Sequence, residues 1–382
     1  MKNVYFDSAA TTQVREEVVD RMTRVLKENY GNPSSTHSYG RSSKSLIEQA
    51  RKTVAGILNV KASEIVFTSG GTEADNLALN SAVRDLGVER IITSKIEHHA
   101  VLYTVKQLQE CFDVELEYVA IDSSGHINME DLESRLKASD KKTLVSLMHV
   151  NNEIGNKLDL KKTAELIKSH GALFHSDTVQ SIGHYKLDLN DIPVDFTAVS
   201  AHKFHGPKGA GFAFVRRNSG LKPLIFGGEQ ERGHRAGTEG VHNIVGLVEA
   251  LKLAYENLEE EQEYICSLKD YFIKSLKEEI PGVKFNGACE DNDNSTYTLL
   301  NVCLPVTEEK ALMLLFQLDL KGIACSKGSA CQSGSDQGSH VLNAFCCEED
   351  LKRPSLRFSF SRYNTKEEVD YVVKVLKEFI ES

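Results

Sequence analysis

Short apolar segments rich in β-branched residues alternate with longer amphipathic segments in the N-terminal part of the chain. The apolar segments EIVFTSG, RIITSK and TLVSLMHV are followed by GTEADNLALNSAVRDLG, HHAVLYTVKQLQE and LKKTAELIKSHG, and further strand candidates are ALFHS, FTAVS and GAGFAFVRR. Strands that alternate with helices are typical of crossover units and a mostly parallel sheet with helices on its faces. The pattern therefore predicts a large α/β domain over residues 16–255.

The rest of the chain has a different pattern. A helical periodicity runs from residue 244 to residue 280 and is broken only by Pro281 and Gly282, which predicts one long helix that bridges two domains. STYTLLNVCLP and SLRFSFSRY predict strands, and KEEVDYVVKVLKEFIES predicts an amphipathic terminal helix. We therefore expect a small α+β domain formed by residues 1–15 and 256–382.

Length, composition and charge narrow the class of protein. A chain of 382 residues exceeds the size of one hydrophobic core, which agrees with two domains. No apolar run is long enough for a membrane helix, and MKNVYFDSAATT lacks the pattern of a signal peptide. The net charge of -10 disfavours a nucleic-acid partner. We expect a cytoplasmic protein with no membrane or nucleic-acid partner, whose eight cysteines are mostly reduced thiols.

The stretch SGGTEADN lies between a predicted strand and a predicted helix. Gly71 lets the backbone turn closely, and Thr72 and the free amides at the helix start offer donors to an anion, most naturally a phosphate. A simple helix cap explains the same residues, so the stretch alone does not decide. The P-loop pattern G-x-x-x-x-G-K-[ST] does not occur in the sequence, which speaks against a P-loop nucleotide site.

Two charged residues follow predicted strands at the same expected edge of the sheet. Asp177 ends the strand before TVQSIG, and Lys203 follows the next strand in SAHKFHGPKGAG. Taken singly, Asp177 can be explained as a helix N-cap and Lys203 as a surface lysine. Together they supply the two groups that pyridoxal phosphate requires, an amine for its aldehyde and an acid beside its ring nitrogen.

Histidines and a cysteine add candidate chemistry. His98 in KIEHHAV can stack on a planar cofactor and exchange protons, whereas a structural role explains His99 equally well. Cys331 lies in a Gly- and Ser-rich loop at about 325–340 and is the candidate nucleophile. An incidental thiol, or a metal site that includes Cys325, Cys346 and Cys347, is the alternative, but their spacing fits no common zinc pattern, so we expect no metal.

Ten motifs in order resemble one known family. They are YFDSAATT, GNPSSTHSYGR, FTSGGTEADNLAL, EHHAV, HVNNEIG, HSDTVQSIG, SAHKFHGPKGAGF, RAGTEGVHNIVG, GSACQSGS and SLRFSFSRYNT. Together they resemble the cysteine desulfurases of the class V aminotransferase fold, and most closely the group that supplies sulfur for iron-sulfur cluster assembly. The resemblance implies a fold-type I transferase dependent on pyridoxal 5'-phosphate, with a mostly parallel seven-stranded sheet flanked by helices and a smaller α+β domain.

The resemblance also implies roles for single residues. Lys203 would hold the cofactor, Asp177 would face its ring nitrogen, Gln180 would donate to its phenolic oxygen, and His98 would stack on the ring and handle protons. Cys331 would form the persulfide. Further implied residues are the phosphate ligands Gly71, Thr72, Ser200 and His202, the substrate-carboxylate ligands Asn152 and Arg357, and Thr238, which would reach the phosphate of the neighbouring subunit in a homodimer.

One part of the loop departs from the family pattern. Asp336, Gln337 and Gly338 replace the usual Leu-Glu-Pro, which puts the loop conformation and partner docking in doubt but not the cofactor site. The implied reaction converts L-cysteine to L-alanine, with sulfur passing through Cys331 to an acceptor such as an iron-sulfur scaffold protein or a thiolation pathway. Alternatives are a selenocysteine lyase, an aminotransferase, or a non-catalytic assembly scaffold with the same fold.

Overall fold

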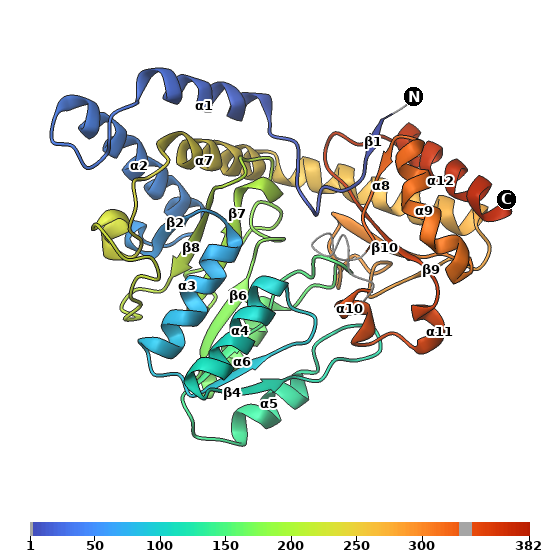
Figure 1. Ribbon diagram of the computed structural model, residues 1–382, viewed down its shortest axis with the longest axis horizontal. Helices are drawn as coiled ribbons and strands as arrows, with labels where there is room; N and C mark the ends of the chain where they lie inside the picture. The colour runs from blue at the N-terminus through green and yellow to red at the C-terminus, as the bar shows by residue number, and fades with distance from the viewer. Residues whose placement is uncertain (1–2, 328–337) are drawn as a thin grey trace.

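A central sheet dominates the computed structural model, which describes residues 3–327 and 338–382 (Figure 1). Within these residues the sheet has seven strands in the order β2-β8-β7-β6-β5-β3-β4. The strands from β7 to β4 are parallel to their neighbours, and β8 is antiparallel to both β7 and β2. The predicted α/β class with a mostly parallel sheet is confirmed. The bounds are β2 Ile65–Thr68, β3 Arg90–Thr93, β4 Glu115–Tyr118, β5 Thr143–Ser146, β6 Leu173–Asp177, β7 Phe196–Ser200 and β8 Gly211–Val215.

Helices cover both faces of this sheet (Figure 1). One face carries α3 (Gly71–Arg84) and α4 (His99–Phe112), which pack on each other, and α3 also packs on β7 and β8. The other face carries α1 (Glu16–Glu28), α2 (Ser38–Ile57), α5 (Met129–Lys137), α6 (Leu160–Ser169) and α7 (Val241–Glu256). Of the helices in residues 3–327 and 338–382, none is both long and apolar enough to cross a membrane.

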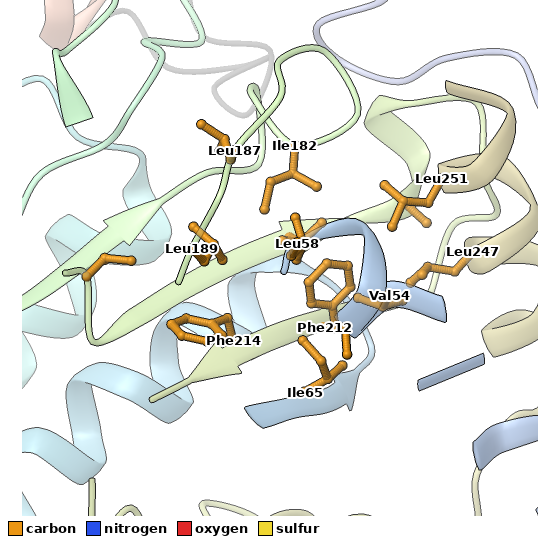
Figure 2. Packing of buried hydrophobic residues seen from close by; sticks show 14 of the residues in the cluster. Val54, Leu58, Ile65, Ile182, Leu187, Leu189, Phe212, Phe214, Leu247 and Leu251 are labelled. Carbon is orange, nitrogen blue, oxygen red and sulfur yellow. The ribbon is translucent and has the colours of Figure 1, made fainter. Parts of the chain in front are cut away.

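The strands of the sheet are buried on both faces, which explains their nearly continuous apolar sequences. In β8, Phe212 and Phe214 belong to the core beneath α2 and α7, whereas Ala213 between them belongs to the core beneath α3. Figure 2 shows this first core at close range, with Phe212 and Phe214 among the aliphatic residues Val54, Leu58, Ile65, Ile182, Leu187, Leu189, Leu247 and Leu251.

A second core joins the two ends of the chain. Val4 and Phe6 pack with apolar side chains from residues 265–376, and Phe6 contacts the rings of Phe272, Phe358 and Phe360. Its elements are α8 Leu258–Glu279, α9 Glu308–Leu320, α12 Lys366–Glu381, the antiparallel sheet β12 Ser355–Ser359, β10 Leu299–Cys303 and β9 Lys284–Phe285, and the parallel pair β1 Val4–Tyr5 and β11 Ile323–Ala324; the short helices α10 His340–Asn343 and α11 Glu348–Leu351 lie nearby. The predicted domain boundaries stay a prediction.

The single long helix predicted from residue 244 to residue 280 is wrong. The helices α7 and α8 end and begin on either side of Asn257, which has a non-helical backbone. The Leu253 carbonyl accepts hydrogen bonds from both the Asn257 side chain at 2.9 Å and the Asn257 backbone amide at 3.3 Å. Asparagine competes in this way for backbone groups, which is why it favours helix ends. The terminal helix is confirmed as α12, where Thr365 and Glu368 form a capping box.

Candidate functional site

A cavity of about 290 Å³ opens at the carboxyl ends of β6 and β7. Most residues predicted from the sequence line it, although they come from distant parts of the chain. These residues are Gly71, Thr72, His98, Asn152, Asp177, Gln180, Ser200, His202, Lys203 and Arg357. Thr238 is exposed and does not line this cavity, and Cys331, Asp336 and Gln337 lie outside the described residues.

The order of the parallel strands explains how Asp177 and Lys203 come together. Asp177 is the last residue of β6, and Ser200 is the last residue of the neighbouring strand β7. Lys203 ends the single 3₁₀ turn, Ala201–Lys203, that follows β7. Because parallel neighbours end at one edge of a sheet, ligands of α/β proteins bind there. The prediction that both residues lie at this edge is confirmed.

Asp177 is a buried carboxylate at the base of the cavity. Its Oδ1 accepts a hydrogen bond from the Val179 amide at 2.9 Å, and a turn follows instead of the helix that an N-cap requires. Burial raises the pKa of Asp177 to about 6, while the Val179 amide and the Lys203 charge act in the opposite direction. A cation placed against this carboxylate would keep it ionised, so Asp177 is suited to face a protonated ring nitrogen.

The N-terminal segment holds Lys203 in place. The Lys203 Nζ donates to the carbonyl oxygens of Ala9 at 2.6 Å and Ala10 at 2.9 Å. Gln180 Nε2 also donates to the Ala9 carbonyl, at 3.0 Å. The SAATT stretch therefore closes one side of the cavity and aims the amine of Lys203 across it.

The start of α3 forms a second wall. A Cβ added at Gly71 would lie 2.5 Å from Cγ2 of Val179, so a larger residue there would push into the turn after β6. The first amides of a helix lack intrahelical partners and carry a partial positive charge. Thr72, Ser200 and His202 line the cavity with Gly71 and add hydroxyl and imidazole groups. This wall is suited to an anion such as a phosphate.

His98 is the N-cap of α4. Its Nδ1 accepts a hydrogen bond from the Ala100 amide at 3.1 Å, so the ring proton of the neutral imidazole lies on Nε2. Burial is the leading cause that lowers the pKa of His98 to about 4, and the charges of Lys203 and His340 contribute to the same shift. His98 is therefore a neutral ring at pH 7 that presents an N–H donor.

Arg357 of β12 brings a positive charge to the opposite side of the cavity. It donates through Nη1 to the Asn152 carbonyl at 2.8 Å and through Nη2 to Oδ1 of Asp7 at 2.9 Å. Ser326 donates to the same Asp7 oxygen at 2.7 Å. The guanidinium is buried, and its Nε has no hydrogen-bond partner among residues 3–327 and 338–382. This arrangement is suited to a carboxylate ligand.

Several lining residues were missed at the level of sequence. Asp75, Glu153 and His340 were not named, and His99, for which a structural role was an equally good explanation, also lines the cavity. His340 lies 4.5 Å from the ring of His99 and donates through Nε2 to the Glu97 carbonyl, while Ser339 donates to the carboxylate of Glu153. Their place in the sequence was the signal that could have pointed to them. Asp75, His99 and Glu153 each lie within a motif that already held a predicted residue.

The described cysteines and metal-ligating side chains bear on the remaining predictions from the sequence. Burial raises the pKa of Cys325 to about 12 and that of Cys346 to about 11, and Cys347 is exposed. In the part of the chain that the structure describes, no group of three or more His, Cys, Asp or Glu side chains is arranged to hold a metal ion. A thiol with a raised pKa is a poor nucleophile at neutral pH, so Cys325 and Cys346 are not suited to that role.

Comparisons with known proteins cover nearly the whole chain. Residues 4–372 match the family described as Aminotransferase class-V. The cysteine desulfurase IscS of Dictyoglomus turgidum is 40% identical over 382 residues, which are 100% of this chain and 95% of the relative. A solved NifS-like protein is 35% identical, with a TM-score of 0.89 and coverage of 100% of both chains. The structure of SspA in complex with cysteine is 32% identical, with a TM-score of 0.81 over 95% of this chain and 100% of that chain.

Proposed function

This chain belongs to the aminotransferase class-V family as a cysteine desulfurase, a pyridoxal-phosphate-dependent enzyme, and from that premise we propose how its residues perform the reaction. L-cysteine loses its sulfur to the Cys331 thiol, and the products are L-alanine and a persulfide on Cys331. The step is balanced, because the carbon-sulfur bond of the substrate breaks as the sulfur-sulfur bond forms and the carbon skeleton gains a proton. The observation that carries the proposal is one cavity lined by Lys203, Asp177, His98 and Arg357.

The cavity residues fit pyridoxal 5'-phosphate. Lys203 offers an amine, Asp177 a buried carboxylate for the ring nitrogen, and Gln180 an amide for the phenolic oxygen. The start of α3, with Gly71 and Thr72, is suited to the phosphate, together with Ser200 and His202. When bound, the cofactor supplies an acceptor for the electrons left at the α-carbon of an amino acid.

Lys203 and His98 have different roles in the proton transfers of the proposed reaction. The Lys203 amine would accept the α-proton of the substrate, and the carbonyls of Ala9 and Ala10 hold this amine by hydrogen bonds. The neutral ring of His98 lines the same cavity, holds a proton on Nε2 and would stack on the cofactor ring. Its lowered pKa keeps this ring uncharged at neutral pH, so it does not oppose the positive charge of Lys203.

The wall opposite Lys203 holds the substrate. The Arg357 guanidinium binds the substrate carboxylate with the help of Asn152, because two charge-assisted hydrogen bonds fix both position and orientation. The solved relative SspA was determined with cysteine, which supports L-cysteine as the substrate here. Cys331 then accepts the sulfur and passes it to an acceptor, such as an iron-sulfur scaffold protein or a thiolation pathway.

The assembly is part of the same proposal. We propose a homodimer in which the partner subunit's Thr238 reaches the phosphate, and the exposure of Thr238 outside its own cavity supports this arrangement. We also propose that residues 16–255 form the cofactor-binding domain, with residues 1–15 and 256–382 as the small domain. The separate core formed by Val4, Phe6 and residues 265–376 supports this division.

The test is the reaction itself. The purified protein with pyridoxal phosphate should convert L-cysteine to alanine and gain the mass of one sulfur atom at Cys331, as measured by amino-acid analysis and peptide mass spectrometry. Cys331→Ala should form no persulfide, whereas Cys347→Ala, which removes an exposed thiol, should behave as the unaltered protein. An unchanged alanine yield from Cys331→Ala with a sulfide acceptor present would exclude Cys331 as the nucleophile.

The same assay separates the alternatives. A selenocysteine lyase would form alanine from selenocysteine without Cys331, and an aminotransferase would form a keto acid. A non-catalytic scaffold would form neither product after addition of the cofactor. Any of these three results in place of the expected one would overturn the proposed reaction.

A further inference from the structure

A carboxyl-imidazole pair is buried beside Asp177. Asp75 of α3 and His175 of β6 are 1% and 0% exposed, and Oδ1 of Asp75 lies 3.3 Å from Nε2 of His175. Neither atom has a hydrogen-bond partner among the residues that the structure describes. A carboxylate oxygen and an unprotonated imidazole nitrogen are both acceptors, so a proton belongs between them. The question is how many protons the pair holds in total.

The second nitrogen of His175 also has a partner. Its Nδ1 lies 2.8 Å from Oγ of Ser146, which stands directly beside His175 on the neighbouring strand β5. A serine hydroxyl can donate or accept, so this contact allows two states. In one state Nδ1 carries a proton and Asp75 donates its own proton to Nε2. In the other Nε2 carries the only proton, Asp75 is ionised, and the pair has a charge of -1.

The surroundings favour the state with the extra proton. Burial raises the pKa of Asp75 well above its usual range, and the nearby carboxylates of Asp177 and Glu97 raise it further. Burial also lowers the pKa of His175 to about 3. Among the residues that the structure describes, Lys203 is the further charged group that acts on this cluster, through Asp177. Ionised Asp75 would add an unpaired negative charge to a buried site that already contains two other carboxyl groups.

We propose that Asp75 and His175 hold the proton of a neutral pair, so that Asp177 alone carries the negative charge beneath the cofactor ring. The inference rests on the proposed function for the role of Asp177. His175 acts as the acceptor that turns the Asp75 proton away from Asp177. Without it, Asp75 would donate that proton to Asp177, and the carboxylate would bind the ring nitrogen less strongly. Asp75 and His175 are thus positioning residues for the Asp177 charge.

The protonation state can be measured without the cofactor. We expect ¹⁵N NMR of the histidine-labelled protein, freed of cofactor at pH 7, to show a proton on Nδ1 of His175, with the signal assigned by its loss in His175→Gln. A neutral ring with its proton on Nε2 and none on Nδ1 would show that Asp75 does not donate a proton to His175 and would overturn the inference. This result does not depend on the reaction that the protein catalyses.

The effect on Asp177 can be measured by binding. We expect His175→Leu to weaken pyridoxal phosphate binding about tenfold, which equals one pKa unit of lost interaction. The 1-deaza analogue has no ring nitrogen, so its affinity should fall less than twofold in the same variant. Asp75→Asn keeps a donor for Nε2 through its amide and should lose distinctly less affinity than His175→Leu. Equal losses for both compounds would overturn the role of the pair.

A matched control lies on the same strand. Ser176 is buried between His175 and Asp177, and successive residues of a strand point to opposite faces, so Ser176→Ala alters β6 without touching the pair. Its affinity for both compounds should be unchanged. If the unaltered protein bound neither compound, the proposed function and the cofactor part of this inference would both fail. The Nδ1 measurement would still decide the protonation state by itself.

Discussion

The two sides of the cavity are built in different ways. The floor, formed by Asp75, Asp177 and Lys203, comes from α3, the end of β6 and the turn after β7, which all belong to the large sheet and its helix. The wall lines the cavity through Arg357 of β12, which is held by Asp7 from the beginning of the chain, and Ser326 after β11 donates to Asp7. The floor therefore needs one sheet, whereas the wall needs both ends of the chain.

The charges are also handled differently. In the floor, burial is the leading cause of the raised pKa values of Asp75 and Asp177. In the wall, Arg357 and Asp7 form a direct ion pair at 2.9 Å, with a hydroxyl on the same carboxylate. A floor in which burial shifts the pKa values of its acidic groups is suited to proton transfer, and a wall of paired charges is suited to holding a ligand. Variants on each side should therefore change different kinetic constants.

The largest effect is expected from the floor. Lys203→Ala removes the proposed proton acceptor, so the rate of alanine formation should fall about 1000-fold, within the range typical of general acid-base groups. Lys208→Ala removes an exposed lysine from the same segment and is the matched control. A loss of less than tenfold in Lys203→Ala, measured by alanine release, would remove Lys203 from the proposed role.

The next effect is expected from the wall. Asp7→Asn removes the charge that orients Arg357, so the KM for L-cysteine should rise about 30-fold, as expected for the loss of a hydrogen bond between charged groups. The value of kcat should change much less, because Asp7 does not line the cavity. Steady-state kinetics measure both constants. A fall in kcat at unchanged KM would contradict the division between floor and wall.

Glu97, a buried carboxyl group outside the floor, predicts a pH dependence of stability. Burial raises the pKa of Glu97 to about 8, so between its unfolded value and pH 8 the folded protein holds a proton that the unfolded chain has lost. This stabilisation is lost as the pH rises. Between pH 6.5 and pH 8 the cofactor-free protein should lose about 2 kcal/mol of unfolding free energy that Glu97→Gln does not lose. Urea titrations of the unaltered protein and of Glu97→Gln at both pH values measure the difference. An equal loss of unfolding free energy in both proteins would contradict the burial argument.

The smallest effect is again in the wall. Ser326→Ala removes one neutral donor to Asp7 and leaves the ion pair with Arg357 intact, so the KM should rise about fivefold, equivalent to about 1 kcal/mol. An increase as large as that of Asp7→Asn would mean that the hydroxyl, and not the charge, orients the guanidinium. Together, Asp7→Asn and Ser326→Ala therefore separate the contribution of the Asp7 charge from that of the Ser326 hydroxyl.

Sequence patterns predicted the floor better than the wall. Asp177 and Lys203 follow apolar segments of the kind that form parallel strands, and such strands end at a common edge, so their meeting follows from local pattern alone. Asp7 and Ser326 gave no such signal, because the expectation that both ends of the chain form one small domain did not indicate which of their side chains would meet. The break at Asn257 was missed because the apolar periodicity continues through it.

The amino-acid sequence by itself determined the α/β class, the strands of the large sheet except β4, and most of the residues that line the cavity, because these depend on periodicity and on motifs. Only the tertiary structure decided that α3 brings Asp75 against His175, and that Asp7 holds Arg357. Both contacts join residues far apart in the chain, and their protonation and orientation depend on burial, which exists only after the elements have packed.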